Sequence, residues 1–494
     1  MHAADAVNPP GSFTWRKEAP LGMSEGTVEL RDAIRRNKMT GFQWNVILIC
    51  IFLTIVDGYE ILITAFTLPA LTEHFDLSRG QQGLIASIGT LGMGIGAAVL
   101  APIGDKFGRR THISFSLILI VIGMVLSGLS PSYELFLVFR FFAGLFLGGI
   151  VPSINVLVAE YASDKRRGTA MGIYGIGLPL GAAVGGFLSI WLIGNFTWRG
   201  PYFFSAGVTA ILLLWVLVAL PESVGYLVEK RPKNALARYN KIGAKLGVAP
   251  AAELPPQAVV ERKPSVGRDM WTGIMLRRTL LLWLSYGLLI SAFYFSNTLT
   301  AQLVRESTGD PTIGILAQSL MAVGGVMGAL TFAALSARMH PRLVTAVLMA
   351  FGMISFILFA QFFTIASLVL FLAVLVGIAS TGGVGAYYAI SPPIYPTVIR
   401  ATAIGLMMGF GRVIAFLAPN IAAFLLAQGL TPANVYIVYG IFLGGASLSA
   451  FLLHRTYRGE NRFDAMELEG HTIELSPMDE APQGPARSGQ GQQP

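Results

Sequence analysis

The stretch from Gly80 to Tyr133 reads GQQGLIASIGTLGMGIGAAVLAPIG, then DKFGRR, then THISFSLILIVIGMVLSGLSPSY, and it decides the fold. Two segments without charged residues flank a short, strongly charged turn. A helix needs about 20 apolar residues to cross roughly 30 Å of hydrocarbon, and a charge at its centre costs several kcal/mol. The stretch therefore predicts a helical hairpin that crosses a membrane twice.

The same pattern recurs along the chain. Further charge-free windows that each fit one span are residues 141–159, 168–198, 200–221, 279–304 and 311–337. The window 343–399 predicts spans nine and ten, and 413–454 holds most of span eleven and all of span twelve. The first span, Trp44 to about Phe66, is interrupted by two acidic residues. We therefore expect an all-α membrane protein with twelve transmembrane helices in two six-helix halves.

The composition excludes a water-soluble protein. Of 494 residues, 54% are hydrophobic and 13% are charged, against roughly a quarter charged in soluble domains. The 56 glycines suit helices that approach closely inside lipid. The one cysteine, Cys50, lies in an apolar run, so neither a disulfide framework nor a thiolate metal site is available. We expect no enzymatic activity, no metal and no organic cofactor.

The distribution of basic residues predicts the orientation. With twelve spans, the basic residues outside the spans lie on one side of the membrane, apart from Arg79, Arg199 and Arg305. The positive-inside rule then places both termini in the cytoplasm. The net charge of +8 is thus mainly a topology signal and does not indicate nucleic-acid binding. We expect a monomer in the bacterial plasma (inner) membrane, with the lipid bilayer as its surroundings.

Polar segments divide the chain. The expected parts are a cytoplasmic tail 1–43 with a short surface helix near 28–36, a six-helix half 44–221, a basic cytoplasmic linker 222–278, a second half 279–454 and a disordered tail 455–494. Two halves joined by a long linker are the layout of a duplicated transporter whose halves rock about a midplane site. The turn 335–342 weakly repeats the turn 104–110, which supports duplication.

Four charged residues lie inside predicted spans, and such residues are functional candidates by default. Asp57 and Glu60 are three residues apart, so they share a helix face and raise each other's affinity for a proton. They are candidates for proton coupling, and a static salt bridge is the alternative. Arg140 and Arg412 are candidates for binding a carboxylate substrate through a bidentate fork, or for acting as permanent counter-ions.

The charged turn carries the first family resemblance. Asp105 to Arg110 resembles the signature loop between the second and third helices of the major facilitator superfamily, with Ala101 where a glycine is usual. Charges at the end of span four resemble the inner gate of the same superfamily. The resemblance implies gating roles for Asp105, Arg109, Arg110, Glu160, Arg166, Arg167 and Arg400.

A narrower resemblance follows. The run Asp57, Gly58, Tyr59, Glu60 resembles the Asp-Gly-x-Asp motif of the aromatic acid/proton symporter family, which includes 4-hydroxybenzoate and benzoate carriers. The stretches 140–167 and 395–419 also match. Glu60 replaces the family's second aspartate, and span seven reads FSNTL at 295–299 where Trp-Leu-Pro is expected, so both departures concern expected pocket positions. Candidate residues to stack on an aromatic ring are Tyr59, Tyr174, Phe293, Tyr294, Tyr387 and Tyr388, and packing between helices is the alternative for each.

The resemblance implies proton-driven symport of a small, aromatic carboxylate by alternating access, with the proton as coupling ion. A proton/drug antiporter of the same fold is an alternative, but Gly177 to Gly181 in span five lacks the Gly-Pro typical of such antiporters. A carrier of sugars or other metabolites is another, although span seven lacks paired glutamines. A membrane receptor would need an added signalling domain, for which the sequence gives no indication.

Overall fold

A computed structural model describes residues 30–256, 270–271, 273–395 and 397–457. Its regular elements are all helices. The expected tail before Leu30 and the tail after Tyr457 lie outside the described residues, as does Val28 of the expected surface helix.

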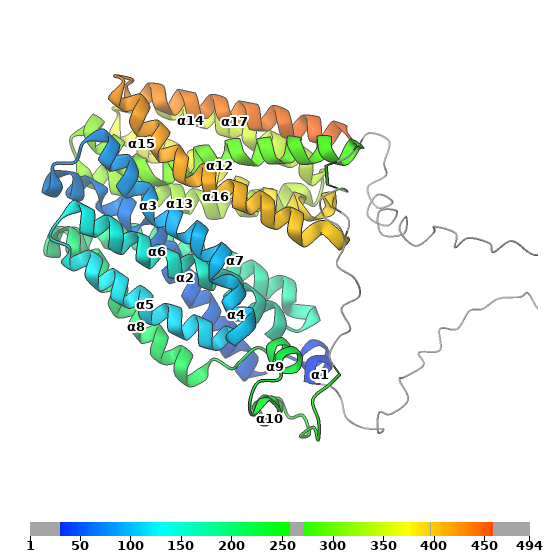
Figure 1. Ribbon diagram of the computed structural model, residues 1–494. Coiled ribbons are helices and arrows are strands. Elements are labelled where there is room, and N and C mark those ends of the chain that lie inside the picture. Colours follow the sequence, from blue (N-terminus) through cyan, green and yellow to red (C-terminus); the bar gives the residue numbers. More distant parts are fainter. Residues whose placement is uncertain (1–29, 257–269, 272, 396, 458–494) are drawn as a thin grey trace, which may run out of the picture.

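The helices fall into two groups of six long members (Figure 1). The first group contains α2 (Gly41–Phe75), α3 (Arg79–Val99), α5 (Arg109–Leu129), α6 (Tyr133–Tyr161), α7 (Asp164–Phe196) and α8 (Gly200–Ala219). The second contains α12 (Gly273–Thr308), α13 (Pro311–Ser336), α14 (Pro341–Gln361), α15 (Ala366–Ile390), α16 (Thr397–Ala427) and α17 (Pro432–Arg455). Shorter helices are α1 (Leu30–Arg36), α4 (Ala101–Phe107), α9 (Val224–Lys230), α10 (Ala235–Lys245), η1 (Thr197–Arg199) and η2 (Pro392–Ile394).

The prediction of twelve membrane-spanning helices is confirmed for the described residues. Eleven continuous segments are long and apolar enough to cross a membrane, and one of them, Asp164–Ala219, contains both α7 and α8 joined by η1. The window 343–399 divides into α14 and α15 as predicted. The first span differs, because α2 continues beyond Phe66 to Phe75.

Local sequence signals mark where several helices begin. Thr40 and Gln43 form a capping box at the start of α2, with each side chain satisfying a backbone N–H of the other residue. Asp310 caps α13 by accepting a hydrogen bond from the backbone N–H of Thr312, and Pro311 takes the first helical position, where no N–H is needed. These caps fix the residues at which α2 and α13 begin.

Glycines set the helix crossings within each half. A methyl group on Gly148 of α6 would lie 2.0 Å from the carbonyl oxygen of Met93 in α3. The corresponding contact in the second half is Gly377 of α15, where a methyl group would lie 1.9 Å from the carbonyl oxygen of Met321 in α13. Only glycine allows backbones to approach so closely. We call these two crossings, α3 with α6 and α13 with α15, the glycine seams.

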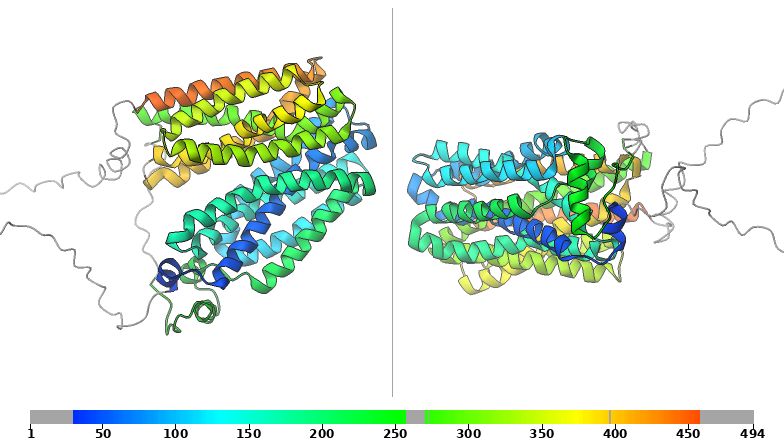
Figure 2. Two further views of the ribbon diagram at one scale, coloured as in Figure 1. Left: turned by 180° about the vertical axis from the view of Figure 1, so that it is seen from behind. Right: turned by 90° about the horizontal axis from the view of Figure 1, so that it is seen from below.

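The two ends of the bundle differ. We call the end that carries α1, α9, α10 and the turn 105–110 the basic face, and the other end the opposite face (Figures 1 and 2). The halves touch mainly through α3 with α16, α7 with α13 and α2 with α12. Toward the opposite face, Asn420 of α16 donates to the Ser87 hydroxyl of α3 at 2.8 Å, and Gly186 of α7 lies against Ser319 of α13.

Candidate substrate and proton site

Asp57 and Glu60 are both buried in α2 but point to different neighbours. Glu60 faces α8, where its Oε1 accepts hydrogen bonds from the hydroxyls of Ser205 at 2.7 Å and Thr209 at 2.9 Å. Oδ1 of Asp57 has no hydrogen-bond partner among the described residues. Glu60 is therefore held inside its own half, whereas Asp57 keeps an unsatisfied oxygen.

Asp57 lies near the second half of the molecule. Its carboxylate interacts electrostatically with the guanidinium of Arg412, which lies on α16, and with Glu60. The phenol of Tyr174 on α7 also lies within electrostatic range of Asp57. An acid of the first half and a base of the second half thus influence each other across the interface between the halves.

Arg412 is surrounded by tyrosines. Its Nη1 donates to the hydroxyl of Tyr294 on α12 at 3.1 Å. The phenols of Tyr286 and Tyr388 are also within electrostatic range of the guanidinium. A guanidinium has five N–H donors, so donors remain for a carboxylate. We call Asp57, Tyr174, Tyr286, Tyr294, Tyr388 and Arg412 the central cluster.

Close backbone approach makes room for Arg412. A methyl group on Gly94 of α3 would lie 3.1 Å from Cβ of Arg412, and one on Gly411 would lie 2.6 Å from the ring of Tyr286. These glycines let α3 and α12 approach the arginine from two sides. A methyl group on Gly411 would force the Tyr286 ring to shift, whereas one on Gly94 would require Arg412 to move by only a few tenths of an ångström.

Arg140 occupies a different environment. Its Nη2 donates to the backbone carbonyl of Glu60 at 3.1 Å, its Nη1 contacts the sulfur of Met124 at 3.1 Å, and its guanidinium lies 5.7 Å from the ring centre of Tyr202. All of these groups belong to the first half. Arg140 also interacts electrostatically with the Glu60 carboxylate, which fits the expectation of a counter-ion.

Two of the expected stacking residues lie away from the central cluster. Tyr59 covers Gly185, and its hydroxyl accepts a hydrogen bond from Ser189 at 3.3 Å, so it packs between helices of the first half. Tyr387 is fully buried and hydrogen-bonds to Ser285 within the second half. Tyr388, which was also a candidate, and Tyr286, which was not, lie near Arg412. Tyr388 is the residue after Tyr387, and Tyr286 lies about two turns before Tyr294 on α12.

The expected gating residues gather at the basic face. Arg109 donates from Nη1 to the Glu160 carboxylate and to the Ser223 hydroxyl, and from Nη2 to Asp105 at 3.3 Å. Ser223 in turn donates to the other oxygen of Glu160 at 2.7 Å. Asp105 is 69% exposed, so the network centres on Arg109 and Glu160. It joins the start of α5, the end of α6 and the start of α9 within one half.

The charged turn requires a glycine at position 108. Gly108 has a φ of 103°, a conformation that side chains with a Cβ disfavour. A methyl group there would also lie 2.5 Å from Oε2 of Glu222. Oε1 of Glu222 accepts hydrogen bonds from the backbone N–H groups of Arg110 and Ser223, each at 3.0 Å. Glu222 thereby caps α5, an arrangement that the sequence alone did not reveal.

The remaining gating candidates have local contacts. Arg167 donates to the backbone carbonyl of Ala159 at 2.7 and 3.2 Å, and Arg400 donates to that of Tyr395 at 3.1 Å. Arg166 is exposed. The ion pairs of Arg109 with Glu160 and of Arg167 with Asp164 both lie within the first half.

Ion pairs at the opposite face join the two halves. Arg79 at the start of α3 contacts Glu306 of α12 at 2.5 Å. Arg305 of α12 pairs with Glu73 near the end of α2 and donates to the carbonyl oxygen of Pro69 at 2.6 Å. We call Glu73, Arg79, Arg305 and Glu306 the outer ion pairs. They were not expected as gating residues, although Arg79 and Arg305 stand out as two of the few basic residues on that side.

No group of three or more His, Cys, Asp or Glu side chains in the described parts of the chain is arranged to hold a metal ion. The central cluster combines a carboxylate, a guanidinium and phenol hydroxyls.

Twelve spanning helices in two packed halves, with charged side chains where the halves meet, define a membrane transporter built on two six-helix bundles. The family model of the Major Facilitator Superfamily matches residues 47–309, more than half of the chain, and the chain belongs to this family.

Relatives are similar along nearly their whole length. A gallate transporter from Pseudomonas putida is 27% identical, over 86% of this chain and 95% of that protein. The 4-hydroxybenzoate transporter PcaK from Acinetobacter baylyi is also 27% identical, over 86% of this chain and 94% of that one. The expected resemblance to 4-hydroxybenzoate-type carriers is confirmed, and the chain is a transporter, not an enzyme.

A solved structure shares the fold. The crystal structure of a D-xylose-proton symporter superposes with a TM-score of 0.64 over 84% of this chain and 97% of that chain, at 15% sequence identity. At that identity, the similarity concerns the arrangement of the helices. The predicted fold is therefore confirmed.

Proposed function

We propose that the protein imports a small aromatic carboxylate together with protons, by alternating access between its two halves. The observation that carries the proposal is the pairing, across the interface of the halves, of Asp57 with its unsatisfied oxygen and Arg412 with its remaining donors. Relatives named as gallate and 4-hydroxybenzoate transporters support an aromatic acid as substrate.

Charge balance links the proton to the substrate. When Asp57 is ionised, its charge partly neutralises Arg412 and repels a second carboxylate. When Asp57 takes up a proton, the half-buried arginine is left with an uncompensated charge inside the membrane-spanning region, which a substrate carboxylate then satisfies. Proton and substrate anion therefore bind best together, which is the requirement for symport.

The tyrosines suit an aromatic acid. Tyr286, Tyr294 and Tyr388 surround the guanidinium with ring surfaces and hydroxyls. Phenol rings stack against an aromatic ring, and their hydroxyls hydrogen-bond to ring substituents. The combination fits a flat molecule with a carboxylate at one end.

The orientation follows from the charges. The basic face is assigned to the cytoplasm, because basic residues concentrate there. The outer ion pairs join the halves on the external side, whereas the ion pairs of Arg109 and Arg167 stay within one half. The structure is therefore interpreted as the inward-facing state, in which the external path is closed.

The test is uptake by the purified protein in liposomes with an imposed pH gradient. Labelled gallate, 4-hydroxybenzoate and benzoate are compared with aliphatic acids and sugars, each with and without a protonophore. We expect concentrative uptake of at least one aromatic acid that the protonophore abolishes. Uptake that persists unchanged with the protonophore, or that favours sugars, contradicts the proposal.

The orientation has its own test. Single cysteines are placed at Lys233 on the basic face and at Glu306 on the opposite face, in a Cys50→Ala background. In intact cells, a membrane-impermeant maleimide is expected to label the position at 306 and not the one at 233. The reverse labelling would invert the assigned orientation.

A further inference from the structure

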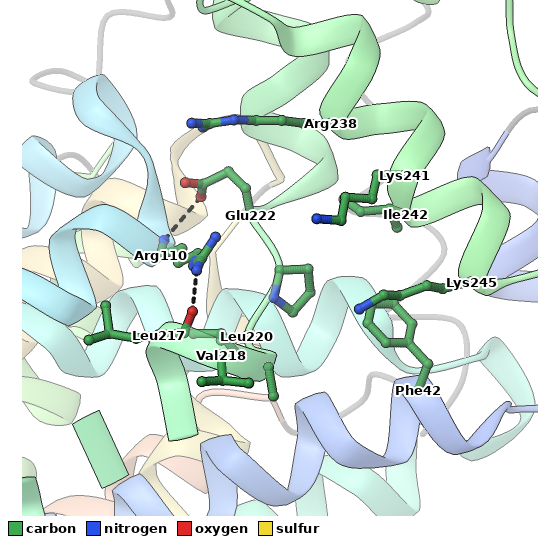
Figure 3. A pocket seen from close by; sticks show the side chains of 12 residues that line it. Phe42, Arg110, Leu217, Val218, Leu220, Glu222, Arg238, Lys241, Ile242 and Lys245 are labelled. Carbon is green, nitrogen blue, oxygen red and sulfur yellow. Dashed lines mark hydrogen bonds between the residues drawn. The ribbon is translucent and has the colours of Figure 1, made fainter. Parts of the chain in front are cut away.

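A cavity of about 330 Å³ lies at the basic face, outside the central cluster (Figure 3). Its walls are the end of α8, the segment that follows it and one side of α10. Four basic side chains line it: Arg110, Arg238, Lys241 and Lys245. None of the proposed transport steps uses this space.

The basic side chains converge because of their spacing on α10. Arg238, Lys241 and Lys245 are three and four residues apart, so they occupy one face of the helix. The side of α10 that turns away from the cavity is anchored in the protein, with Tyr239 and Gly243 buried. Figure 3 shows the two lysines pointing from α10 into the same space as Arg110.

Positive charge in the cavity is largely uncompensated. The acidic residue in the lining is Glu222, and its Oε1 is engaged by backbone N–H groups of Arg110 and Ser223. Lys245 lies 4.8 Å from the ring centre of Phe42, and Arg110 donates to the carbonyl oxygen of Leu217 at 2.5 Å. Among the described residues, no ion pair involves Arg238, Lys241 or Lys245. The cavity therefore fits an anionic group.

The cavity adjoins a surface that faces lipid. Leu217 and Val218 form part of its wall, and Val218 is 85% exposed. One and two turns earlier on α8, Leu214 and Ile211 are also more than half exposed. In a membrane these side chains meet acyl chains, and the basic side chains stand where phosphate groups lie. Basic side chains that suit a phosphate group therefore lie next to apolar side chains that suit acyl chains.

We propose that this cavity binds the phosphate headgroup of an anionic phospholipid from the adjoining leaflet, with the acyl chains lying along α8. The lipid would connect the linker helix α10 with the start of α5 and the end of α8. Phosphatidylglycerol has the required chemistry, since it combines one phosphate charge with two acyl chains.

The proposal is tested on the full-length protein in detergent. Binding of short-chain phosphatidylglycerol is titrated by native mass spectrometry, with phosphatidylcholine of the same chain length as the zwitterionic comparison. We expect phosphatidylglycerol to bind more tightly. A basic residue near an anionic lipid surface contributes about fivefold in affinity, so Lys241→Ala with Lys245→Ala should weaken binding about 25-fold. Lys241→Arg with Lys245→Arg should keep it.

Lys233→Ala is the matched control, because Lys233 is an exposed cation on the same connecting segment and does not line the cavity. Inorganic phosphate distinguishes a lipid from a soluble ion. We expect millimolar phosphate not to displace the lipid. Equal binding of both lipids, displacement by phosphate, an unchanged affinity in the double alanine variant, or an equal loss in the Lys233 variant would each overturn the proposal.

Discussion

Arg140 and Arg412 are both arginines of spanning helices, one in each half, yet their surroundings differ: Arg140 is buried and Arg412 is half-buried. Arg140 contacts a backbone carbonyl, a sulfur and an aromatic ring of its own half. Arg412 donates to one phenol and faces an acid of the other half. The contacts of Arg140 all lie within one half, although its Nε has no hydrogen-bond partner among the described residues, whereas Arg412 lies where the two halves meet.

The difference teaches how coupling is distributed between the halves. The first half supplies the acids and a fixed counter-ion, and the second supplies the arginine and most of the phenols of the central cluster. Neither half contains both the coupling acid and the substrate arginine. Under the proposed function, proton and substrate therefore meet only where the halves meet.

The largest effect is expected from Asp57→Asn. An amide still forms hydrogen bonds but cannot carry a proton, so concentrative uptake should be lost and substrate should only equilibrate. Glu60→Asp, which keeps an acid near Ser205 and Thr209, should be milder. Uptake against a gradient that retains its pH dependence in the Asn variant would show that Asp57 is not the coupling acid.

Arg412→Lys comes next. A lysine carries the charge but cannot form the planar bidentate fork, so the KM for an aromatic acid should rise about tenfold while folded protein remains in the membrane. The measurement is uptake kinetics together with the amount of folded protein. If the Lys variant binds and transports the acid as well as the parent, the substrate role of Arg412 is wrong.

Arg140→Met should act on stability instead. Removing the guanidinium strands the buried Glu60 carboxylate, which costs roughly 3 to 5 kcal/mol when a buried pair is broken. The variant should show a lower Tm or poor expression. Adding Glu60→Gln should recover part of the Tm if the two residues are partners, and adding Asp57→Asn should recover less. Equal rescue by both would remove the distinction between the two arginines.

The outer ion pairs should influence the equilibrium between the inward-facing and outward-facing states more than the stability of the fold. Exposed pairs contribute about 0.2 to 1 kcal/mol each, so Arg79→Ala with Arg305→Ala should shift the ratio of inward-facing to outward-facing protein by a factor of about five. Distances between spin labels on the two halves report that ratio. Arg199→Ala is the control, since Arg199 contacts Trp198 in its own half at 4.4 Å; an equal shift there would argue against a gate.

The smallest effects distinguish two adjacent tyrosines. Tyr388→Phe removes a hydroxyl near Arg412 and should raise the KM about threefold, the effect of losing one modest hydrogen bond. Tyr387→Phe removes a hydroxyl that bonds to Ser285 inside the second half, so it should lower the Tm and leave the KM unchanged. Uptake kinetics and thermal melting of both variants test which of the two hydroxyls acts on the substrate and which acts on stability.

The helices were predictable because lipid imposes a simple rule on the sequence. Charges are costly inside the bilayer, so charge-free windows locate the spans, and α14 and α15 fell inside one window as expected. The charged residues inside spanning helices, Asp57, Glu60, Arg140 and Arg412, were recognisable for the same reason. Arg109 and Glu160 were found through their resemblance to a known motif.

The directions of side chains were not predictable. One residue along a helix turns the side chain by about 100°, so Tyr387 and Tyr388 face different neighbours, and a choice between them from sequence is arbitrary. Asp57 and Glu60 differ by about 60° around α2, which is enough to send one toward Arg412 and the other toward α8. The outer ion pairs join residues more than 200 positions apart, and neither partner reveals the other in a single sequence.

The glycine seams carry a consequence for measurements of motion. A crossing in which backbone meets backbone has no long side chains that can change rotamer and absorb a shift, so its spacing has one permitted value. Labels attached to the lipid-facing sides of α3 and α6 should therefore report a single narrow distance throughout the transport cycle. The distance within one half can then serve as a fixed reference. A broadened or doubled distance between labels on the two halves is then attributed to the transport movement.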